Sequence, residues 1–393
     1  MSTTKKIYFE PAGRIHSSQQ ELIDYPPDGY QFITSKTLFD KRIVGSDLMF
    51  YKLRLSVLDR LMPLNLAKAW LDTFLRKIPE DVDLIYAYNH PVFRKKPWVV
   101  SVEWANVLVG RDLRYFPRYK KSVEKLLASD YCRKILTWTE MAKKSILLNF
   151  NCADFEHKIE VIPPAVHSKD FIKDYNQDKV RLLFIGSVND PKDFEAKGGN
   201  EALQAFTILN SKYDNLELVV RAKLPNHIRS EYAGLSNLRV VEEILPWQLL
   251  EQEFHQADIF LFPSHLLQNT VVLDAMSYEL PVVTTEIGAT NGEYVEDGVT
   301  GFVIASSDKV PYFTGNFILT SETIHRGRLI KATRSLEPKV VDELAAKTSL
   351  LIENPDLRRK MGKAARWEVD HGRFSIERRN ERLKKIFDEA VRV

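Results

Sequence analysis

Cysteine is nearly absent from this sequence. Cys132 and Cys152 are the only two among 393 residues, and they do not stand at a metal-ligand spacing. Two isolated cysteines exclude a disulfide scaffold and a zinc framework, so we expect reduced thiols inside the core of a cytosolic protein. No apolar run reaches the roughly 18 residues of a membrane-spanning helix, and residues 1–9 lack the apolar centre of a signal peptide. The sequence therefore predicts a cytoplasmic location.

Other signatures are missing as well. The chain has no internal repeat, no low-complexity tract, no P-loop and no Gly-x-Ser-x-Gly nucleophile elbow. No recognised nucleic-acid-binding module accompanies its basic residues. The net charge is only +3, but residues 1–165 carry 26 basic and 19 acidic side chains, against 30 and 34 in the remainder. A basic first half and an acidic second half suggest two domains with different partners.

What is present is an α/β pattern long enough for two domains. The composition, with 44% hydrophobic and 28% charged residues, is that of an ordinary globular protein. In the first domain, 1–166, an amphipathic helical pattern at 46–77 accompanies a series of short apolar runs. These runs predict strands at 6–9, 30–33, 83–88, 97–102, 134–139 and 158–162. A double proline at 163–164 ends the domain, and 167–179 is the expected linker.

The second domain, 180–373, opens with an apolar strand at 180–187 that contains Gly186 and Ser187 near its end. A loop with Lys197 and two glycines then precedes a helix. Lysine and glycines at the start of a helix suit phosphate oxygens, because the helix N-terminus is positive and the lysine adds a point charge. Further strands are expected at 216–220 and 238–241.

The chain is organised around residues 258–304. An apolar run at 258–264 predicts a buried strand, and 270–277 predict a helix that is apolar on nearly every side except at Asp274. A strand at 280–285 and a glycine-containing loop at 288–301 complete half of a doubly wound sheet, in which ligands bind beyond the carboxyl ends of the strands. The amides of Asn269, Thr270 and Val271 would face an anion there. Asp274 would either receive a sugar hydroxyl or bond a neighbouring backbone group.

These segments resemble a known family. Phe-Pro-Ser at 262–264, Leu-Asp-Ala-Met at 273–276, Pro-Val-Val at 281–283 and Glu-Tyr-Val-Glu-Asp-Gly at 293–298 resemble the C-terminal signature of the family 4 glycosyltransferases. The resemblance implies the GT-B fold, in which two doubly wound Rossmann-like domains face each other across a cleft. It also implies a retaining enzyme that moves a sugar from a nucleoside diphosphate sugar without a metal or any other cofactor.

The resemblance assigns roles to particular residues. Lys197 and the amides around Thr270 would hold the diphosphate, Asp274 the ribose, and the loop 288–293 would line the sugar. A loop at 242–246 would contact the base mostly through its backbone. The expected donor-binding residues are Gly186, Ser187, Lys197, Arg221, Leu245, Asn269, Thr270, Val271 and Asp274, and the expected catalytic residues are Glu103, Asp274 and Glu293. A terminal helix at 374–393 would cross back to the first domain.

The sequence departs from the family at three places. The family usually carries two glutamates separated by seven residues, but Asp274 takes the second place and Leu266 falls on the first. The family's Gly-Phe-Gly turn is replaced by Leu-Gln-Asn at 267–269. Its arginine beside the strand-end glycine is replaced by Ser187, and Arg221 or Lys223 is expected to supply the missing charge.

Two features of the first domain concern an acceptor. Glu103 directly follows a predicted strand and would face either a sugar or the rim of the crevice. A basic patch with interleaved aromatic residues follows, formed by Arg111, Arg114, Arg118, Lys120 and Lys121. The patch suits an acidic acceptor or an anionic membrane surface, which would place the protein peripherally at the inner face of the membrane. A solvated helix face is the alternative.

Three functions are compatible with these residues. The leading hypothesis is a retaining, metal-independent glycosyltransferase whose partners are a nucleoside diphosphate sugar and a saccharide or lipid-linked acceptor, without nucleic acid. The second is a sugar-nucleotide epimerase or a phosphorylase of the same fold. The third is a GT-B-like binding or scaffold protein without turnover, for which Leu266 is the strongest argument.

Overall fold

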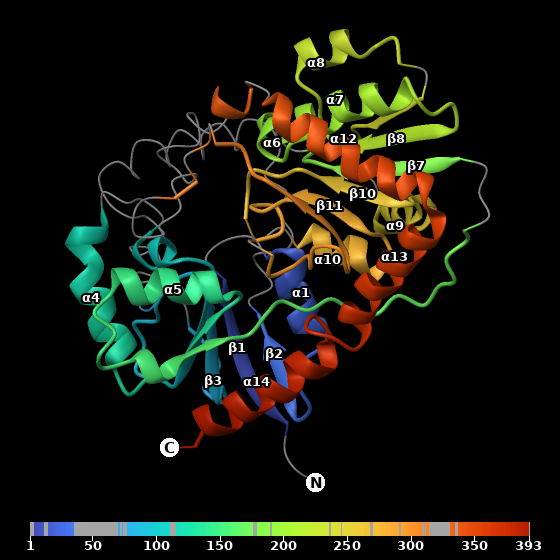
Figure 1. Ribbon diagram of the computed structural model, residues 1–393. Helices are drawn as coiled ribbons and strands as arrows, with labels where there is room; N and C mark the ends of the chain where they lie inside the picture. The colour runs from blue at the N-terminus through green and yellow to red at the C-terminus, as the bar shows by residue number, and fades with distance from the viewer. Residues whose placement is uncertain are drawn as a thin grey trace. The chain divides into compact units, whose positions relative to one another are not determined.

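The computed structural model describes residues 4–11, 15–34, 70, 73, 77–110, 115–175, 179–188, 191–235, 237–244, 246–267, 270–290, 292–308, 310, 312–313, 331–334 and 337–392. The chain divides into two compact units, drawn in Figure 1. Unit 1 comprises Met1–Ala165, Phe313–Ile324 and Ile376–Val393, and unit 2 comprises Val166–Tyr312 and His325–Ser375. Each unit contains one six-stranded sheet.

The sheet of unit 1 is entirely parallel, with the strand order β2-β1-β3-β4-β5-β6. Its strands are β1 (Lys5–Pro11), β2 (Tyr30–Ile33), β3 (Leu84–Tyr88), β4 (Trp98–Val102), β5 (Cys132–Thr137) and β6 (Ile159–Val161). All residues of β3 and β4 are buried, because helices cover both faces of a parallel sheet. The six strands expected in the first half of the sequence are all present, whereas the helical pattern at 46–77 falls almost wholly outside the described residues.

Helices pack on both faces of this sheet. The short η2 (Ala105–Val109) and the helices α4 (Phe116–Ala128) and α5 (Glu140–Asn149) share one apolar cluster with the strands. Thr139 caps α5 by accepting a hydrogen bond from the amide of Ala142 at 3.0 Å. At the C-terminal end of α4, the ammonium of Lys158 donates to the backbone oxygens of Leu127, Ala128 and Ser129 at 2.9–3.1 Å.

The opposite face is covered by α1 (Ser17–Asp24) and α14 (Ile376–Ala390), which runs along the sheet in Figure 1. The four apolar positions expected on one side of the last helix are all buried: Leu383, Ile386, Phe387 and Ala390. Phe387 lies edge-on to Tyr30, Phe32 and Tyr86. The guanidinium of Arg379 donates to the backbone oxygen of Tyr25 at 2.7 Å, which satisfies a carbonyl just beyond the end of α1.

The sheet of unit 2 is also parallel, with the order β12-β11-β10-β7-β8-β9. Its strands are β7 (Val180–Ile185), β8 (Leu216–Arg221), β9 (Leu238–Val241), β10 (Ile259–Phe262), β11 (Val282–Thr285) and β12 (Gly301–Ile304). The central β10 is buried at every position, as its unbroken apolar sequence predicts. The strand β12 lies where no element was expected, because its four residues end a glycine-rich stretch.

The helices described in unit 2 include α6 (Lys192–Ala196), α7 (Gly199–Asn210), α8 (Asn226–Glu231), α9 (Trp247–Gln256), α10 (Val271–Ser277), α12 (Pro338–Glu353) and α13 (Pro355–Asp370). They share one large core with the sheet. The sequence did not indicate α9. The side chain of Asn354 caps α13 by accepting from the amide of Leu357 at 3.0 Å.

The segment before β7 has no helix or strand, but it is anchored to unit 2. Lys173 is 7% exposed and donates hydrogen bonds to the backbone oxygens of His255, at 3.1 Å, and of Ala257. These oxygens belong to the end of α9. Burial lowers the pKa of Lys173 to about 8, although Asp258 and Glu279 oppose the shift.

Candidate functional site

Several expected donor-binding residues lie at the carboxyl edge of the sheet of unit 2. Its strand order changes direction between β7 and β10, and doubly wound sheets bind ligands at this switch point. Gly186 follows β7 and donates its amide hydrogen to the backbone oxygen of Arg221, which ends β8, at 3.0 Å. Ser187 accepts from the amide of Lys223 at 2.8 Å. The fold therefore brings Arg221, which is distant in sequence, next to Gly186 and Ser187.

Lys197 reaches the same edge from the turn between α6 and α7. Its ammonium donates to the backbone oxygen of Gly186 at 3.2 Å. The next residue, Gly198, has a φ of +81°, and a Cβ there would lie 2.0 Å from the backbone oxygen of Pro263. Only glycine permits both this backbone conformation and this close approach. The glycine therefore lets the start of α7 lie directly against the loop after β10.

Lys197 and Arg221 place two positive charges at this point. Burial lowers the pKa of Lys197; Asp193 opposes the shift, and the charge of Arg221 adds to it. Burial also lowers the pKa of Arg221, against the opposing charge of Glu253. The Nε of Arg221 is buried and has no hydrogen-bond partner. Glu253 forms its ion pair with Arg239 rather than with Arg221. Burial disfavours the charged forms of both side chains, and an anionic ligand between them would restore the balance.

The loop after β10 differs from the family pattern in a way that the structure explains. Leu266, at the place of the expected glutamate, packs against a small apolar cluster that contains Ala196 and Val310. Its neighbour His265 is buried between the side chains of Glu201 and Tyr312. Glu201, His265 and Tyr312 were not predicted as site residues. The available signal was a histidine directly after a buried strand.

The helix α10 follows this loop and carries Asp274 in its first turn. The Asp274 amide donates to the backbone oxygen of Thr270 at 3.1 Å, and its own carbonyl accepts from the hydroxyl of Ser277 at 2.6 Å. Asp274 and Val271 are partly buried, whereas the other residues of α10 are buried. The structure therefore places Thr270, Val271 and Asp274 together at one helix start. Asn269 lies outside the described residues.

Threonine hydroxyls hold the loop after β11. Thr284 donates to the backbone oxygen of Phe262 at 2.6 Å, and Thr285 donates to that of Ser264 at 2.5 Å. The Thr285 hydroxyl also accepts from the amide of Gly288 at 3.0 Å, and a Cβ at Gly288 would lie 2.2 Å from the Thr284 hydroxyl. These bonds tie the glycine-containing loop to the end of β10.

The remaining donor-side positions are less closely grouped. Glu293 is partly buried, and its backbone oxygen accepts from the guanidinium of Arg373 at 3.3 Å. Leu245, in the expected base-contacting loop, lies outside the described residues. In the same loop Glu242 accepts from the amide of Leu224 at 2.8 Å and forms an ion pair with Arg229 at 2.5 Å. That carboxylate is engaged in holding the loop itself.

In unit 1, Glu103 follows β4 at the carboxyl edge of the sheet. Its carboxylate accepts a hydrogen bond from the Tyr88 hydroxyl, and its amide donates to the side chain of Asn89 at 2.9 Å. Asn89 is buried with a φ of +60°, a conformation that is uncommon outside glycine. The polar groups around Glu103 therefore hold its carboxylate in a defined position at the edge where a ligand would bind.

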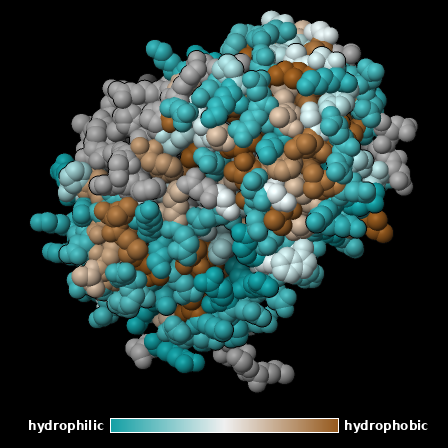
Figure 2. Space-filling model, in the orientation of Figure 1, coloured by the Kyte–Doolittle hydropathy of each residue, from teal (hydrophilic) through white to brown (hydrophobic). Residues whose placement is uncertain are grey.

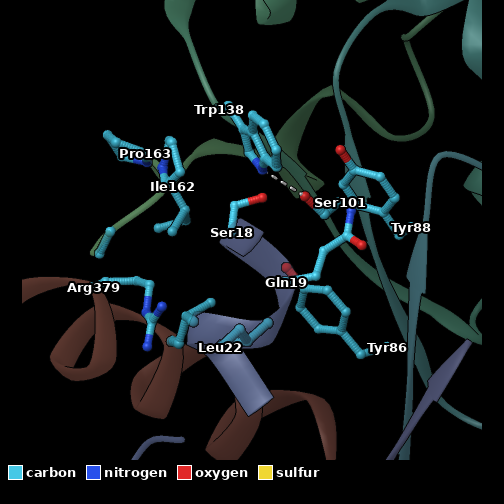
Figure 3. Close-up of a pocket in the computed structure, with 13 residues that line it drawn as sticks. Ser18, Gln19, Leu22, Tyr86, Tyr88, Ser101, Trp138, Ile162, Pro163 and Arg379 are labelled. Carbon is cyan, nitrogen blue, oxygen red and sulfur yellow. Dashed lines mark hydrogen bonds between the residues drawn. The ribbon is translucent and has the colours of Figure 1, made fainter. Parts of the chain in front are cut away.

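A cavity of about 30 Å³ lies beside these residues, entirely within unit 1. Figure 3 shows Ser18 and Gln19, from α1, pointing towards Trp138 and Ser101, whose side chains share a 3.1 Å hydrogen bond. The amide nitrogen of Gln19 is buried and has no partner in the described structure. The cavity therefore offers hydrogen-bond donors to a small polar group, such as a water molecule or a hydroxyl.

The basic patch lies on α4, and three of its five residues are described. Arg118 and Lys121 are exposed, and Lys120 is partly exposed. Arg118 lies over the ring of Tyr119, 5.4 Å from its centroid, and Lys120 is 3.9 Å from Glu124. Arg111 and Arg114 lie outside the described residues. The face shown in Figure 2 is largely hydrophilic, and its apolar areas form separate patches.

Comparison with known proteins finds a match for the segment that carries the switch-point site. Residues 179–315 match the model of the family "Glycosyl transferases group 1". No curated protein sequence matches the chain. Among the described residues, no helix is both long and apolar enough to cross a membrane.

Solved glycosyltransferases share the fold. One from Rickettsia africae ESF-5 is 14% identical, with full coverage of both chains and a TM-score of 0.60. HepE from Anabaena, solved in complex with UDP, is 13% identical, with a TM-score of 0.59 and coverage of 98% of this chain and 99% of HepE. TarM from S. aureus is 14% identical, with a TM-score of 0.55. The match covers 81% of this chain but only 58% of TarM. The two parallel six-stranded sheets, together with the similarity to these solved glycosyltransferases, establish the GT-B fold.

Proposed function

Because residues 179–315 match the model of the group 1 glycosyl transferases within a GT-B fold, we propose that this protein is a retaining glycosyltransferase. It moves a sugar from a nucleoside diphosphate sugar to a saccharide or lipid-linked acceptor, without a metal ion. The donor binds at the switch point of unit 2, and unit 1 binds the acceptor.

The observation that carries this proposal is the pair Lys197 and Arg221. Both cations lie at the carboxyl edge of the sheet, and both have pKa values lowered by burial. A diphosphate would add negative charge beside these two cations, which Asp193 and Glu253 offset only in part. Gly198 keeps the chain free of a side chain at the start of α7, where backbone amides favour phosphate oxygens. Arg221 would thereby replace the arginine that the family carries at the position of Ser187.

The other donor contacts follow from the same placement. Asp274, on the first turn of α10, accepts a ribose hydroxyl, and the amides around Thr270 add donors for the diphosphate. The loop that contains Glu293 lines the sugar. When the bond between sugar and diphosphate breaks, negative charge develops on the departing phosphate, and Lys197 and Arg221 stabilise it electrostatically. Support comes from HepE, which was also solved with UDP-glucose.

On the acceptor side, Glu103 faces the sugar acceptor from the end of β4. The exposed cations of α4 attract an acidic acceptor or an anionic membrane surface, to which the protein would bind peripherally from the cytoplasm. Support for a hydroxylated acceptor comes from TarM, which was solved in complex with alpha-GlcNAc-glycerol and UDP.

A second function is favoured by Leu266. Its side chain packs in an apolar cluster and offers no acceptor for a sugar hydroxyl. A nucleotide-sugar-binding protein without turnover would tolerate this replacement. The two functions predict the same ligand and differ only in whether the sugar is transferred.

Incubation with a panel of nucleotide sugars and candidate acceptors tests the proposal. A transferase releases free nucleoside diphosphate and forms a product whose anomeric configuration, measured by NMR, equals that of the donor. An inverted product would contradict the retaining mechanism. Binding without release of nucleotide would favour the inactive binding protein.

Calorimetry with UDP tests the site itself. Lys197→Ala should weaken binding by about 1.5–3 kcal/mol, the contribution of a charge-assisted hydrogen bond, or roughly tenfold to hundredfold. Lys212→Ala is the matched control, because Lys212 is exposed beyond the other end of α7. Equal UDP affinities of the Lys197→Ala and Lys212→Ala variants would show that the diphosphate does not bind at Lys197.

A further inference from the structure

His265 lies at the centre of a buried chain of hydrogen bonds. The residue is 2% exposed, its Nε2 lies 3.0 Å from a carboxylate oxygen of Glu201, and its Nδ1 lies 2.8 Å from the hydroxyl of Tyr312. A carboxylate can only accept, so Nε2 carries a proton and donates to Glu201. Nδ1 is then free to accept from the Tyr312 hydroxyl. A neutral imidazole satisfies both partners at once.

The surroundings keep Tyr312 in its donor form. Burial raises the pKa of the Tyr312 hydroxyl, and the charge of Glu201 raises it further. The rings of Tyr312 and His265 are nearly parallel, with an interplanar angle of 11° and centroids 6.3 Å apart. The phenol thus remains protonated and fixed in orientation, whereas a nucleophilic role would require the opposite shift.

This chain of bonds joins three separate segments at the edge that holds the cations. Glu201 belongs to the first turn of α7, His265 to the loop after β10, and Tyr312 to the chain beyond β12. The amide of His265 also donates to the backbone oxygen of Ala196 at 3.0 Å. Ala196 precedes Lys197 directly.

The backbone is therefore held on both sides of Lys197. Before it, the carbonyl of Ala196 is bonded to His265, and after it, Gly198 lies against Pro263. A shift of His265 would move the turn that carries Lys197, because the His265 amide is bonded to the carbonyl of Ala196, the residue directly before Lys197.

We propose that Glu201, His265 and Tyr312 are positioning residues that hold Lys197 in place for the diphosphate of the donor. The inference rests on the proposed function, because it assigns these residues to the same site. The loop that carries Leu266 is fixed by its histidine neighbour and by a carboxylate from α7, rather than by a carboxylate of its own. None of the three residues needs to touch the ligand.

If these three residues only packed the core, their replacement would lower stability, and any effect on UDP affinity would be the same with or without Lys197. A double-mutant cycle separates the two cases. UDP affinity by calorimetry and the melting temperature are measured for Tyr312→Phe, His265→Phe, Glu201→Ala and Glu201→Gln. Each change is made in the natural chain and in the Lys197→Ala background. Tyr312→Phe removes a single hydroxyl and remains informative if His265→Phe fails to fold.

We expect Tyr312→Phe and Glu201→Ala each to weaken UDP binding about threefold to tenfold, as the loss of one hydrogen bond suggests. Glu201→Gln should stay within about twofold, because its amide oxygen still accepts from His265. In the Lys197→Ala background, the same changes should weaken binding by less than about twofold. Tyr278→Phe is the matched control; this hydroxyl donates to Glu251 at 2.6 Å at the other end of α10.

Two results would overturn the inference alone. Unchanged UDP affinity in Tyr312→Phe and Glu201→Ala would show that the network does not position Lys197. Losses of equal size in both backgrounds would show that it acts independently of Lys197. If the natural protein binds neither UDP, GDP nor ADP, the proposed function fails, and this inference fails with it.

Discussion

Replacement of Gly198 by alanine should damage both the fold and the candidate site. Gly198 has a φ of +81°, and an added Cβ would meet the backbone oxygen of Pro263 at 2.0 Å and its carbonyl carbon at 2.5 Å. A left-handed conformation costs a residue with a Cβ about 1–2 kcal/mol. The contact adds to this cost, because a backbone atom cannot rotate away as a side chain can.

Other glycines of unit 2 separate these two effects. Gly298 has a φ of +74° but open space around its missing side chain, and Gly234 has neither a strained φ nor a close neighbour. Alanine stabilises a compatible site by about 0.4–1 kcal/mol through the unfolded chain. Gly234→Ala should therefore be neutral or slightly stabilising, and Gly298→Ala should cost roughly 0.5–1 kcal/mol net. Gly198→Ala should cost at least about 3 kcal/mol, in the range of severe single substitutions.

Thermal melting and UDP calorimetry measure the outcome. For a unit of this size, about 1 kcal/mol corresponds to roughly 2–4 °C, so Gly198→Ala should lower the melting temperature by at least about 6 °C. Its UDP affinity should also fall, since Lys197 moves with the turn. Equal melting temperatures for Gly198→Ala and Gly298→Ala would refute the reasoning, because the contact with Pro263 would then cost nothing.

Three further predictions follow from other residues. Lys173 has a pKa of about 8 in the folded protein, against about 10.4 in the unfolded chain, so the unfolded state binds more protons between these two pH values. The free energy of unfolding in urea, relative to that of Lys173→Met, should therefore rise by about 2–3 kcal/mol from pH 7 to pH 10. A difference between the two proteins that stays constant with pH would contradict the lowered pKa. Asp274→Asn should weaken UDP binding roughly tenfold to hundredfold with little change in melting temperature if Asp274 holds the ribose; a lower melting temperature with unchanged affinity would make it a structural anchor. Replacement of Arg118, Lys120 and Lys121 by glutamine removes three positive charges and should reduce binding to anionic vesicles. The assay uses low salt, because at physiological ionic strength charges are screened beyond about 8 Å. Equal sedimentation of the natural protein with neutral and anionic vesicles would exclude electrostatic docking.

The fold was largely predictable because buried parallel strands have an unmistakable sequence. Runs such as the one that became β10 are apolar at every position, and the double proline marks the end of the first series of strands. β12 was not predictable, because four residues after a glycine-containing loop are too few to show a hydrophobic periodicity. The same holds for α9, whose apolar positions are interrupted by glutamine and glutamate.

The candidate site was predictable only where a local motif carried it. Lys197 beside glycines gave a signal within a few residues, and Arg221 was expected from the missing charge at Ser187. The Glu201, His265 and Tyr312 network brings together residues that are 47 and 64 positions apart. No local pattern specifies such a pairing, because it depends on how α7 and the loop after β10 meet in space.

The packing of α14 on the sheet of unit 1 constrains the order in which the chain can fold during synthesis. The sheet surface that includes Tyr30 and Phe32 is covered by residues 376–390, which leave the ribosome only after all of unit 2. Unit 2 can therefore close its own core while this surface of unit 1 is still uncovered. An exposed aromatic surface of this kind invites association with other nascent chains or capture by a chaperone. Completion of unit 1 is thus a late event, set by translation of α14.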